Sequence, residues 1–212
     1  VRLGSLDPSL MTDRFVSKIA DLKSLTPHFH LSLQSGSDRI LALMKRKYNS
    51  RMAFEGMERI RKVMPDAMFT TDIIVGFPGE TEEDFNELCE FVKEAKFEHF
   101  GAFTYSREEN TAAYNFENQI DEDVKQERYD IIMKTQLAST EAYLNSKIGK
   151  ELTVLCEGYD PVSESHYGRS ADNAPEIDGN VFFLSRARVP EGEFVTVRIK
   201  DALEYDLTGD LV

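Results

Sequence analysis

Residues 68–84 read MFTTDIIVGFPGETEED, a run that is apolar at first and then turns through glycine and proline. We interpret Met68–Val75 as a buried strand, because it is the most apolar strand candidate of the chain. The turn Gly76–Thr81 leads into a helix whose start is marked by Thr81 and Asp84, a spacing typical of a capping box. The stretch therefore predicts a strand, a tight turn and a capped helix, which together form one β/α unit.

The same alternation of strand-like and helical periodicity runs through the first two thirds of the chain. Strand-like runs lie at 1–3, 29–33 and 99–105, and helical stripes lie at 15–25, 40–44, 53–64, 85–95 and 121–147. Four successive β/α units predict an α/β domain with a parallel sheet and right-handed crossovers. Ligands of such sheets bind at the carboxyl ends of the strands, so we expect the functional site there.

The periodicity changes at Ile148–Lys150. Beyond this point the chain has short alternating runs around 152–156, 181–184 and 194–199, separated by clusters of Gly, Pro and Asp. This pattern predicts a small all-β barrel of the OB-like kind. The sequence thus predicts two domains, an α/β domain over 1–148 and an all-β domain over 149–212.

The composition excludes several classes of protein. The chain has 212 residues, of which 41% are hydrophobic and 30% charged, as is typical of a folded globular protein and not of a disordered or collagen-like one. It has no apolar run of about 18 residues, the length that predicts a membrane-spanning helix. Its two cysteines do not make a disulfide framework, so we expect a reducing, cytoplasmic environment.

Charge is distributed unevenly along the chain. The formal net charge is −13, yet residues 1–50 carry a net charge of +4, whereas residues 149–212 carry −7. An acidic chain is a poor general binder of the phosphate backbone of nucleic acids. The acidity of the second domain instead predicts a basic partner.

Two strand ends carry residues that are suited to hold a ligand. At Gly76–Thr81 the backbone can approach a ligand closely, and the following helix presents free N–H groups. The strand His28–Leu33 is followed by Gln34-Ser35-Gly36-Ser37, whose side chains can hydrogen-bond a sugar or a carboxylate. Each strand end alone also fits a structural role, as an ordinary turn in the first case and as a helix cap before Asp38 in the second.

Together, the two strand ends resemble the carboxyl-terminal half of the barrel in radical S-adenosylmethionine (SAM) enzymes of the methylthiotransferase family. Further motifs of that family follow in order, Leu43–Tyr48 (LMKRKY) and Tyr105–Glu109 (YSREE). The resemblance implies a partial (β/α) radical SAM barrel with parallel strands up to residue 148. It also implies that residues 149–212 form a TRAM module, the small OB-like barrel that follows in this family. Asn110 departs from the family pattern, which usually has glycine there.

The resemblance also implies a reaction and a set of cofactor-binding residues. Methylthiotransferases reduce one SAM at a [4Fe–4S] cluster to form a radical, insert sulfur, and take the methyl group from a second SAM, so the cofactors supply the difficult chemistry. By resemblance, Arg46 would pair with the SAM carboxylate. The full set of residues implied to bind SAM is Gln34, Ser35, Ser37, Arg46, Asp72, Gly76, Phe77 and Pro78.

The cysteines that hold the clusters in this family have no counterparts in the chain. A cluster needs three or four thiolates, and Cys89 and Cys156 are far apart in the sequence and are predicted to be buried, inert thiols. His28 and His30 lie on one face of a strand, but no third metal ligand is near. We therefore expect no metal site and no catalytic residue in this chain, and we expect the chain alone to be inactive.

The two halves of the chain indicate different substrates. Motifs within 168–207 resemble the branch that modifies an aspartate of the twelfth small-subunit ribosomal protein, which is basic, and Asp172, Glu176 and Asp178 are the candidates for binding it. In contrast, Arg2–Pro8 and Pro27–Gly36 are more similar to the branch that modifies threonylcarbamoyl-adenosine in tRNA. Because the second domain is the substrate-binding module, the sequence favours the ribosomal protein.

Other interpretations stay open at this point. Without its cluster loop the chain is also compatible with a binding module that catalyses nothing. An unrelated α/β enzyme with Asp72 or Glu80 as general base is a further possibility. A barrel that lacks some of its β/α units leaves an unpaired strand edge, here at Val1–Ser5. This edge predicts self-association.

Overall fold

The computed structural model describes residues 1–212, which divide into two compact units. One unit comprises residues 1–25 and 29–139, and the other comprises residues 26–28 and 140–212.

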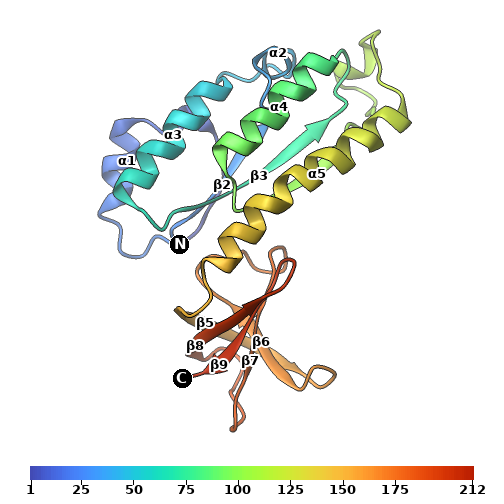
Figure 1. The fold of residues 1–212 in the computed structure, drawn as a ribbon. Helices are drawn as coiled ribbons and strands as arrows, with labels where there is room; N and C mark the ends of the chain where they lie inside the picture. The colour runs from blue at the N-terminus through green and yellow to red at the C-terminus, as the bar shows by residue number, and fades with distance from the viewer. The chain divides into compact units, whose positions relative to one another are not determined.

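The first unit contains a four-stranded sheet in the order β1-β2-β3-β4, in which β1 pairs with β2, and β3 with β4, in parallel (Figure 1). The strands are β1 (Leu3–Leu6), β2 (His28–Gln34), β3 (Met68–Val75) and β4 (His99–Thr104). The helices are α1 (Asp13–Ala20), α2 (Asp38–Leu43), α3 (Ser50–Val63), α4 (Glu82–Ala95) and α5 (Glu122–Asn145), with short 3-10 turns at Pro8–Leu10 and Ala113–Asn115. The predicted α/β class with parallel strands is confirmed.

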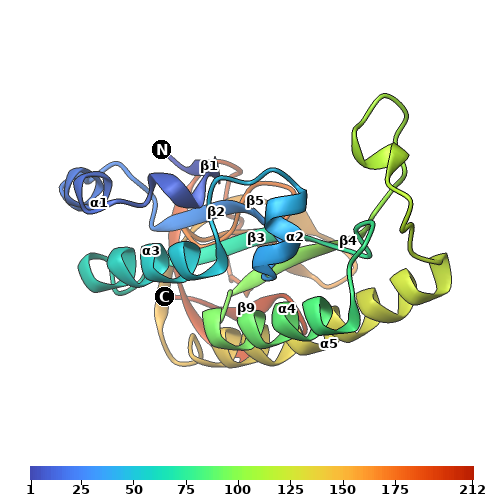
Figure 2. The same cartoon turned by 90° about the horizontal axis from the view of Figure 1, so that it is seen from above.

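The two faces of the sheet differ because side chains alternate along a strand. In β2, Phe29, Leu31 and Leu33 are fully buried and belong to the main hydrophobic core. The residues between them, such as His30 and Gln34, are half-buried. Seen from above, α3, α4 and α5 cover one face of the sheet (Figure 2). Polar side chains are therefore concentrated on the face that the helices leave uncovered.

The start of α4 agrees with the prediction from its sequence. The Thr81 hydroxyl accepts a hydrogen bond from the Asp84 backbone N–H, and the Asp84 side chain accepts one from the Thr81 backbone, which completes a capping box. By contrast, α1 is shorter than its apolar stripe indicated. It ends at Ala20, Leu22 is 52% exposed, and Leu25 reaches the core from the following loop.

The outer strands of the sheet are β1 and β4. Each presents one edge without a neighbouring strand, and unpaired edges favour pairing with another chain. The predicted edge at Val1–Ser5 is thus largely that of β1, and self-association through it stays a prediction.

The second unit is a closed barrel in the order β5-β6-β7-β9-β8. Its strands are β5 (Glu151–Asp160), β6 (Ser165–Arg169), β7 (Val181–Leu184), β8 (Phe194–Ala202) and β9 (Leu207–Leu211). All neighbouring pairs are antiparallel except β7 and β9. The predicted all-β barrel is confirmed, although β6 and β9 were not expected from the sequence. No helix of the structure combines the length and the apolar character needed to cross a membrane.

Candidate functional site

A cavity of about 670 Å³ lies at the carboxyl ends of β2, β3 and β4. This is the edge at which parallel sheets bind ligands. Its lining comes from the three strand ends, from the stretch after α2, and from the loop between β4 and α5. The lining residues are Gln34, Leu43, Met44, Lys45, Arg46, Asp72, Ile74, Phe77, Phe103, Thr104, Tyr105, Ser106, Glu108, Thr111, Ala112, Ala113 and Phe116.

One wall of the cavity is apolar and aromatic. Phe77 packs edge-to-face against Tyr105, with ring centroids 5.3 Å apart, and against Phe116, at 6.1 Å. Ile40, Phe77 and Tyr105 form a small core of their own, separate from the main one. The Tyr105 hydroxyl is buried and has no hydrogen-bond partner in the protein. Such a wall is suited to a flat, weakly polar ring with a few hydrogen-bonding groups.

Polar residues form the rest of the lining. Gln34 ends β2 in a left-handed conformation with φ of 74°, which is uncommon for a residue other than glycine and is often found at functional sites. Arg46 is exposed, and its stretch is anchored by Tyr48, whose hydroxyl donates to the backbone oxygens of Ser32 and Leu33. Burial raises the pKa of Tyr48 to about 12. This side of the cavity therefore offers an amide, a carboxylate from Asp72 and a guanidinium.

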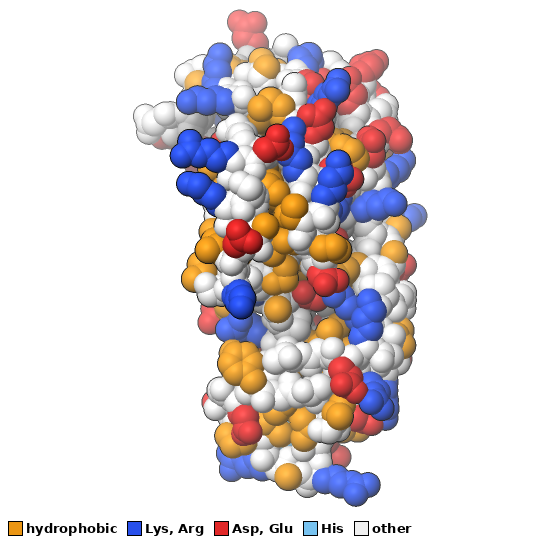
Figure 3. All heavy atoms as spheres, turned by 90° about the vertical axis from the view of Figure 1, so that its left-hand side faces the viewer, with side chains coloured by type: hydrophobic (Ala, Val, Ile, Leu, Met, Phe, Trp, Pro, Cys, Tyr) orange, Lys and Arg blue, Asp and Glu red, His pale blue; other side chains and the backbone are white.

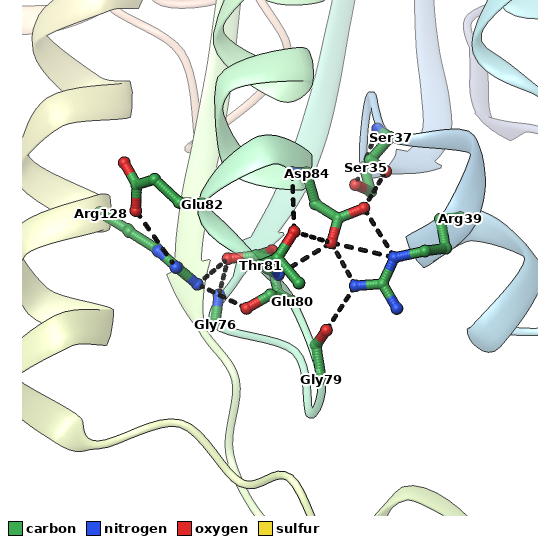
Figure 4. Close-up of polar contacts among 10 residues, drawn as sticks. All are labelled: Ser35, Ser37, Arg39, Gly76, Gly79, Glu80, Thr81, Glu82, Asp84 and Arg128. Carbon is green, nitrogen blue, oxygen red and sulfur yellow. Dashed lines mark hydrogen bonds and ion pairs between the residues drawn. The ribbon is translucent and has the colours of Figure 1, made fainter.

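Outside the cavity lining, Asp84 joins the two turns that follow β2 and β3 (Figure 4). One carboxylate oxygen accepts from the Ser37 hydroxyl at 2.8 Å, and the other accepts from the Thr81 backbone at 2.8 Å and hydroxyl at 2.9 Å. Arg39 forms an ion pair with both oxygens and also donates to the backbone oxygen of Gly79. One buried side chain thus fixes the spacing of the two turns.

The protonation of Asp84 follows from these contacts. Burial raises the pKa of the Asp84 carboxyl, but the hydrogen bonds from Arg39, Thr81 and Ser37 outweigh burial, so this pKa lies well below its ordinary range. The group therefore stays ionised in the folded protein.

A second buried carboxylate, Glu80, holds the turn after β3 from the other side (Figure 4). It accepts from the Gly76 backbone N–H at 2.9 Å and from Arg128 of α5 at 2.7 Å, and both partners of the ion pair are less than 10% exposed. Burial raises the pKa of Glu80, and the contacts with Gly76 and Arg128 offset this only in part. Glu80 is committed to this pair, which argues against its use as a general base.

The turn requires glycine at position 76. Gly76 has φ of 71°, and a Cβ placed on it would lie 2.4 Å from Cγ of Lys125. Lys125 is buried and donates to the backbone oxygen of Tyr105 at 3.0 Å. Helix α5 therefore packs directly against the ends of both β3 and β4.

The structure separates the predicted SAM-binding residues into two groups. Gln34, Arg46, Asp72 and Phe77 line the cavity. The other four lie beneath it or beside it, in the framework of the two turns, and they are Ser35, Ser37, Gly76 and Pro78. Ser37 occupies the N-cap position of α2, yet its side chain bonds Asp84 instead of capping the helix.

The three acidic residues proposed for substrate binding also differ in their surroundings. Asp172 accepts from Tyr143 at 2.6 Å and from Lys147 at 2.7 Å and is only 16% exposed. Asp178 accepts from the Ala174 backbone. Glu176 is exposed, with φ of 64°. The face shown in Figure 3 carries acidic and basic side chains interspersed with apolar ones. Substrate binding by these three residues stays a prediction, with Glu176 the most accessible.

The structure contains no group of three or more His, Cys, Asp or Glu side chains arranged to hold a metal ion. Cys89 and Cys156 are both buried. Burial raises the pKa of the Cys89 thiol to about 11 and also raises that of Cys156.

The ionised state of Asp84 predicts how Asp84→Asn changes stability with pH. Because the folded-state pKa is lowered, Asp84 contributes stability that is fully present above its ordinary pKa of 3.8 and is lost as the pH falls through the folded-state value. We expect Asp84→Asn to lower the free energy of unfolding by about 2–3 kcal/mol at pH 7. The variant should also lose less stability than the wild type between pH 5 and pH 2.

Urea unfolding at several pH values measures both effects. Asp13→Asn is the matched control, because the Asp13 side chain is 93% exposed, and it should reproduce the wild-type pH dependence. Equal loss of stability in acid for the wild type and Asp84→Asn would contradict the role of Asp84.

Sequence reasoning did not identify several residues that build the site. Arg39, Lys125 and Arg128 were not singled out, because their partners are 20 to 48 residues away in the chain. The capping-box spacing did identify Asp84, but only as a cap. Asn110, which departs from the family pattern, has φ of 66°, a conformation that asparagine adopts more readily than most residues other than glycine.

Two family models match the chain. The model of the radical SAM superfamily matches residues 4–92, and that of the TRAM domain matches residues 148–212. In the solved structure of coproporphyrinogen III oxidase (HemN) from Escherichia coli, a radical SAM enzyme, the matching region covers 68% of this chain and 32% of that one. The TM-score is 0.50 and the identity 17%, so this likeness shows the fold alone.

Curated relatives match over almost the entire chain. The ribosomal protein uS12 methylthiotransferase RimO of Clostridioides difficile (strain 630) is 42% identical over 206 residues, which is 97% of this chain and 46% of that protein. RimO of Thermotoga maritima is 38% identical over 212 residues, which is 100% of this chain and 48% of that protein. The chain thus spans about half the length of the curated relatives it matches.

Proposed function

We propose that the chain, as a member of the radical SAM methylthiotransferase family, forms about half of an enzyme that methylthiolates ribosomal protein uS12. The observation that carries the proposal is the similarity to uS12 methylthiotransferases across both units of the chain. The acidic second domain, with a net charge of −7, supports a basic protein as substrate. We place the enzyme in the cytoplasm, with aspartate as the modified residue.

The cavity fits SAM by its size and lining. Small-molecule sites occupy about 300–1,000 Å³ and combine an apolar wall with a few polar groups, as this cavity does. The Tyr105 hydroxyl, which has no partner in the protein, is an additional hydrogen-bonding group in this wall. When bound, SAM supplies the precursor of the radical and the methyl group.

Each side chain of the cavity has a role that follows from its chemistry. Phe77 and Ile74 would cover the adenine and exclude water from it. The Gln34 amide and the Asp72 carboxylate would hydrogen-bond the hydroxyl and amino groups of SAM. Arg46 would pair with its carboxylate. These residues bind and orient the cofactor.

The residues of this chain do not fit an iron–sulfur cluster. Two cysteines, both buried, cannot provide the thiolates that a cluster requires. We therefore assign the [4Fe–4S] clusters to the remainder of the enzyme and derive no step of the reaction through them.

The proposal is tested with the longer enzyme, purified anaerobically and supplied with SAM, a reductant and a sulfur source. We expect mass spectrometry to show a methylthio group on an aspartate of uS12. Unfractionated tRNA is the parallel substrate, because Arg2–Pro8 and Pro27–Gly36 are more similar to the tRNA-modifying branch. Modification of a tRNA nucleoside and not of uS12 would overturn the proposal and establish that second candidate.

A further inference from the structure

A histidine of β2 contacts a threonine and an aspartate of β3, on the face of the sheet that bears Gln34. Nδ1 of His30 lies 3.0 Å from the Thr70 hydroxyl, and Nε2 of His30 lies 3.5 Å from a carboxylate oxygen of Asp72. The side chains of His30 and Asp72 are 29% and 43% exposed. They are therefore open to the space at this face, and Asp72 lines the cavity.

The contacts of His30 set the orientation of its ring. In the tautomer in which the Thr70 hydroxyl donates to Nδ1, the imidazole carries its proton on Nε2, the nitrogen that faces Asp72. This tautomer presents a donor to the Asp72 carboxylate from the β2 side.

On the opposite side of Asp72, the neighbouring residue of β4 has no side chain and so leaves space for the carboxylate. Gly101 is the residue of β4 in register with Asp72. A Cβ placed on Gly101 would lie 3.2 Å from the other carboxylate oxygen of Asp72, which is closer than ordinary packing allows. The carboxylate is thus flanked by His30 on one side and by Gly101 on the other.

We propose that His30 and Gly101 are positioning residues that direct the Asp72 carboxylate toward a hydrogen-bond donor of SAM in the cavity. This inference rests on the proposed function and adds to it two residues that do not line the cavity. An aspartate on an exposed strand face otherwise rotates freely about its last torsion angle. Holding it in the binding orientation lowers the entropic cost of binding.

A double-mutant cycle in the longer enzyme tests the proposal. The dissociation constant of SAM is measured by anaerobic equilibrium dialysis with radiolabelled SAM, which needs no turnover. We expect His30→Ala to raise the constant about fivefold, and Asp72→Ala to raise it tenfold or more, about the loss expected for one charge-assisted hydrogen bond. The double variant should match Asp72→Ala alone, because His30 acts only through Asp72.

Further variants separate positioning from a general structural effect. Ser32→Ala changes the same face of β2, two residues from His30, and should leave the constant unchanged. His30→Gln retains a donor and should recover part of the affinity. Gly101→Ala should weaken SAM binding in the wild type and have no further effect beside Asp72→Ala. Thermal unfolding by circular dichroism confirms that each variant is folded.

Two results would overturn the inference while the wild type binds SAM. In the first, the dissociation constant of the double variant rises by the product of the factors for His30→Ala and Asp72→Ala. In the second, neither His30→Ala nor Gly101→Ala changes the dissociation constant of SAM. Failure of the wild-type enzyme to bind SAM would instead refute the cofactor site of the proposed function, and the positioning role with it.

Discussion

Cleavage of SAM should be undetectable for the 212-residue chain alone, even after reconstitution with iron and sulfide, whereas the longer enzyme should produce deoxyadenosine. A cluster site takes three or four thiolates. The chain has two cysteines, which belong to different units and are both buried. Burial raises the pKa of Cys89 to about 11, so this thiol stays protonated near neutral pH and is a poor ligand.

The measurement has two readouts under reducing, anaerobic conditions. Visible absorbance reports any cluster, and chromatography of the reaction mixture reports deoxyadenosine. Replacing Cys89 and Cys156 by alanine in the longer enzyme is the matched control and should leave both readouts intact. Deoxyadenosine from the isolated chain would refute the assignment of the clusters to the remainder of the enzyme.

Arg128→Met should destabilise the chain by about 3–5 kcal/mol at pH 7, the largest effect we expect from a single substitution. The substitution leaves the Glu80 carboxylate buried with only the Gly76 N–H as a partner. Burial already raises the pKa of Glu80, so the carboxylate binds a proton more readily in the folded state than in the unfolded chain. The deficit should therefore be smallest below the ordinary pKa of 4.5 and grow as the pH rises through the folded-state value.

Chemical unfolding at pH 4 and pH 7 measures this effect. Arg51→Met is the matched control, because Arg51 forms an exposed ion pair with Glu55 on α3, and it should leave the free energy of unfolding nearly unchanged. Combining Arg128→Met with Glu80→Gln removes the buried charge and should recover most of the loss. Equal stabilities of Arg128→Met and Arg51→Met would show that the buried pair is dispensable.

Much of the fold was predictable because hydrophobic periodicity is strong in it. The expected strand Met68–Val75 coincides with β3, and Val181–Leu184 coincides with β7. Strands β6 and β9 were missed because their sequences, SHYGR and LTGDL, have few apolar residues and contain glycine. In the barrel, these glycines are sites of close backbone approach. A Cβ on Gly168 would lie 2.0 Å from the backbone oxygen of Leu155, and one on Gly209 would lie 2.3 Å from that of Arg198.

The candidate site was only partly predictable for a different reason. Motifs located both turns, and the predicted SAM-binding residues that line the cavity are Gln34, Arg46, Asp72 and Phe77. Sequence alone does not show which residues of a motif face a cavity and which support it. Ser37 and Gly76 are supporting residues. Their hydrogen bonds with Asp84 and Glu80 can be recognised only in the folded structure.

The position of Asp84 between the two turns has a consequence for the dynamics of the cavity. Loops at strand ends usually fluctuate independently, as the least stable parts of a domain. Here a hydroxyl from one loop and a backbone N–H from the other share a single carboxylate, although Ser37 and Asp84 are 47 positions apart. Displacement of either loop breaks an anchor of the other. We therefore expect the two loops to move together, and a ligand that orders one loop to order its neighbour as well.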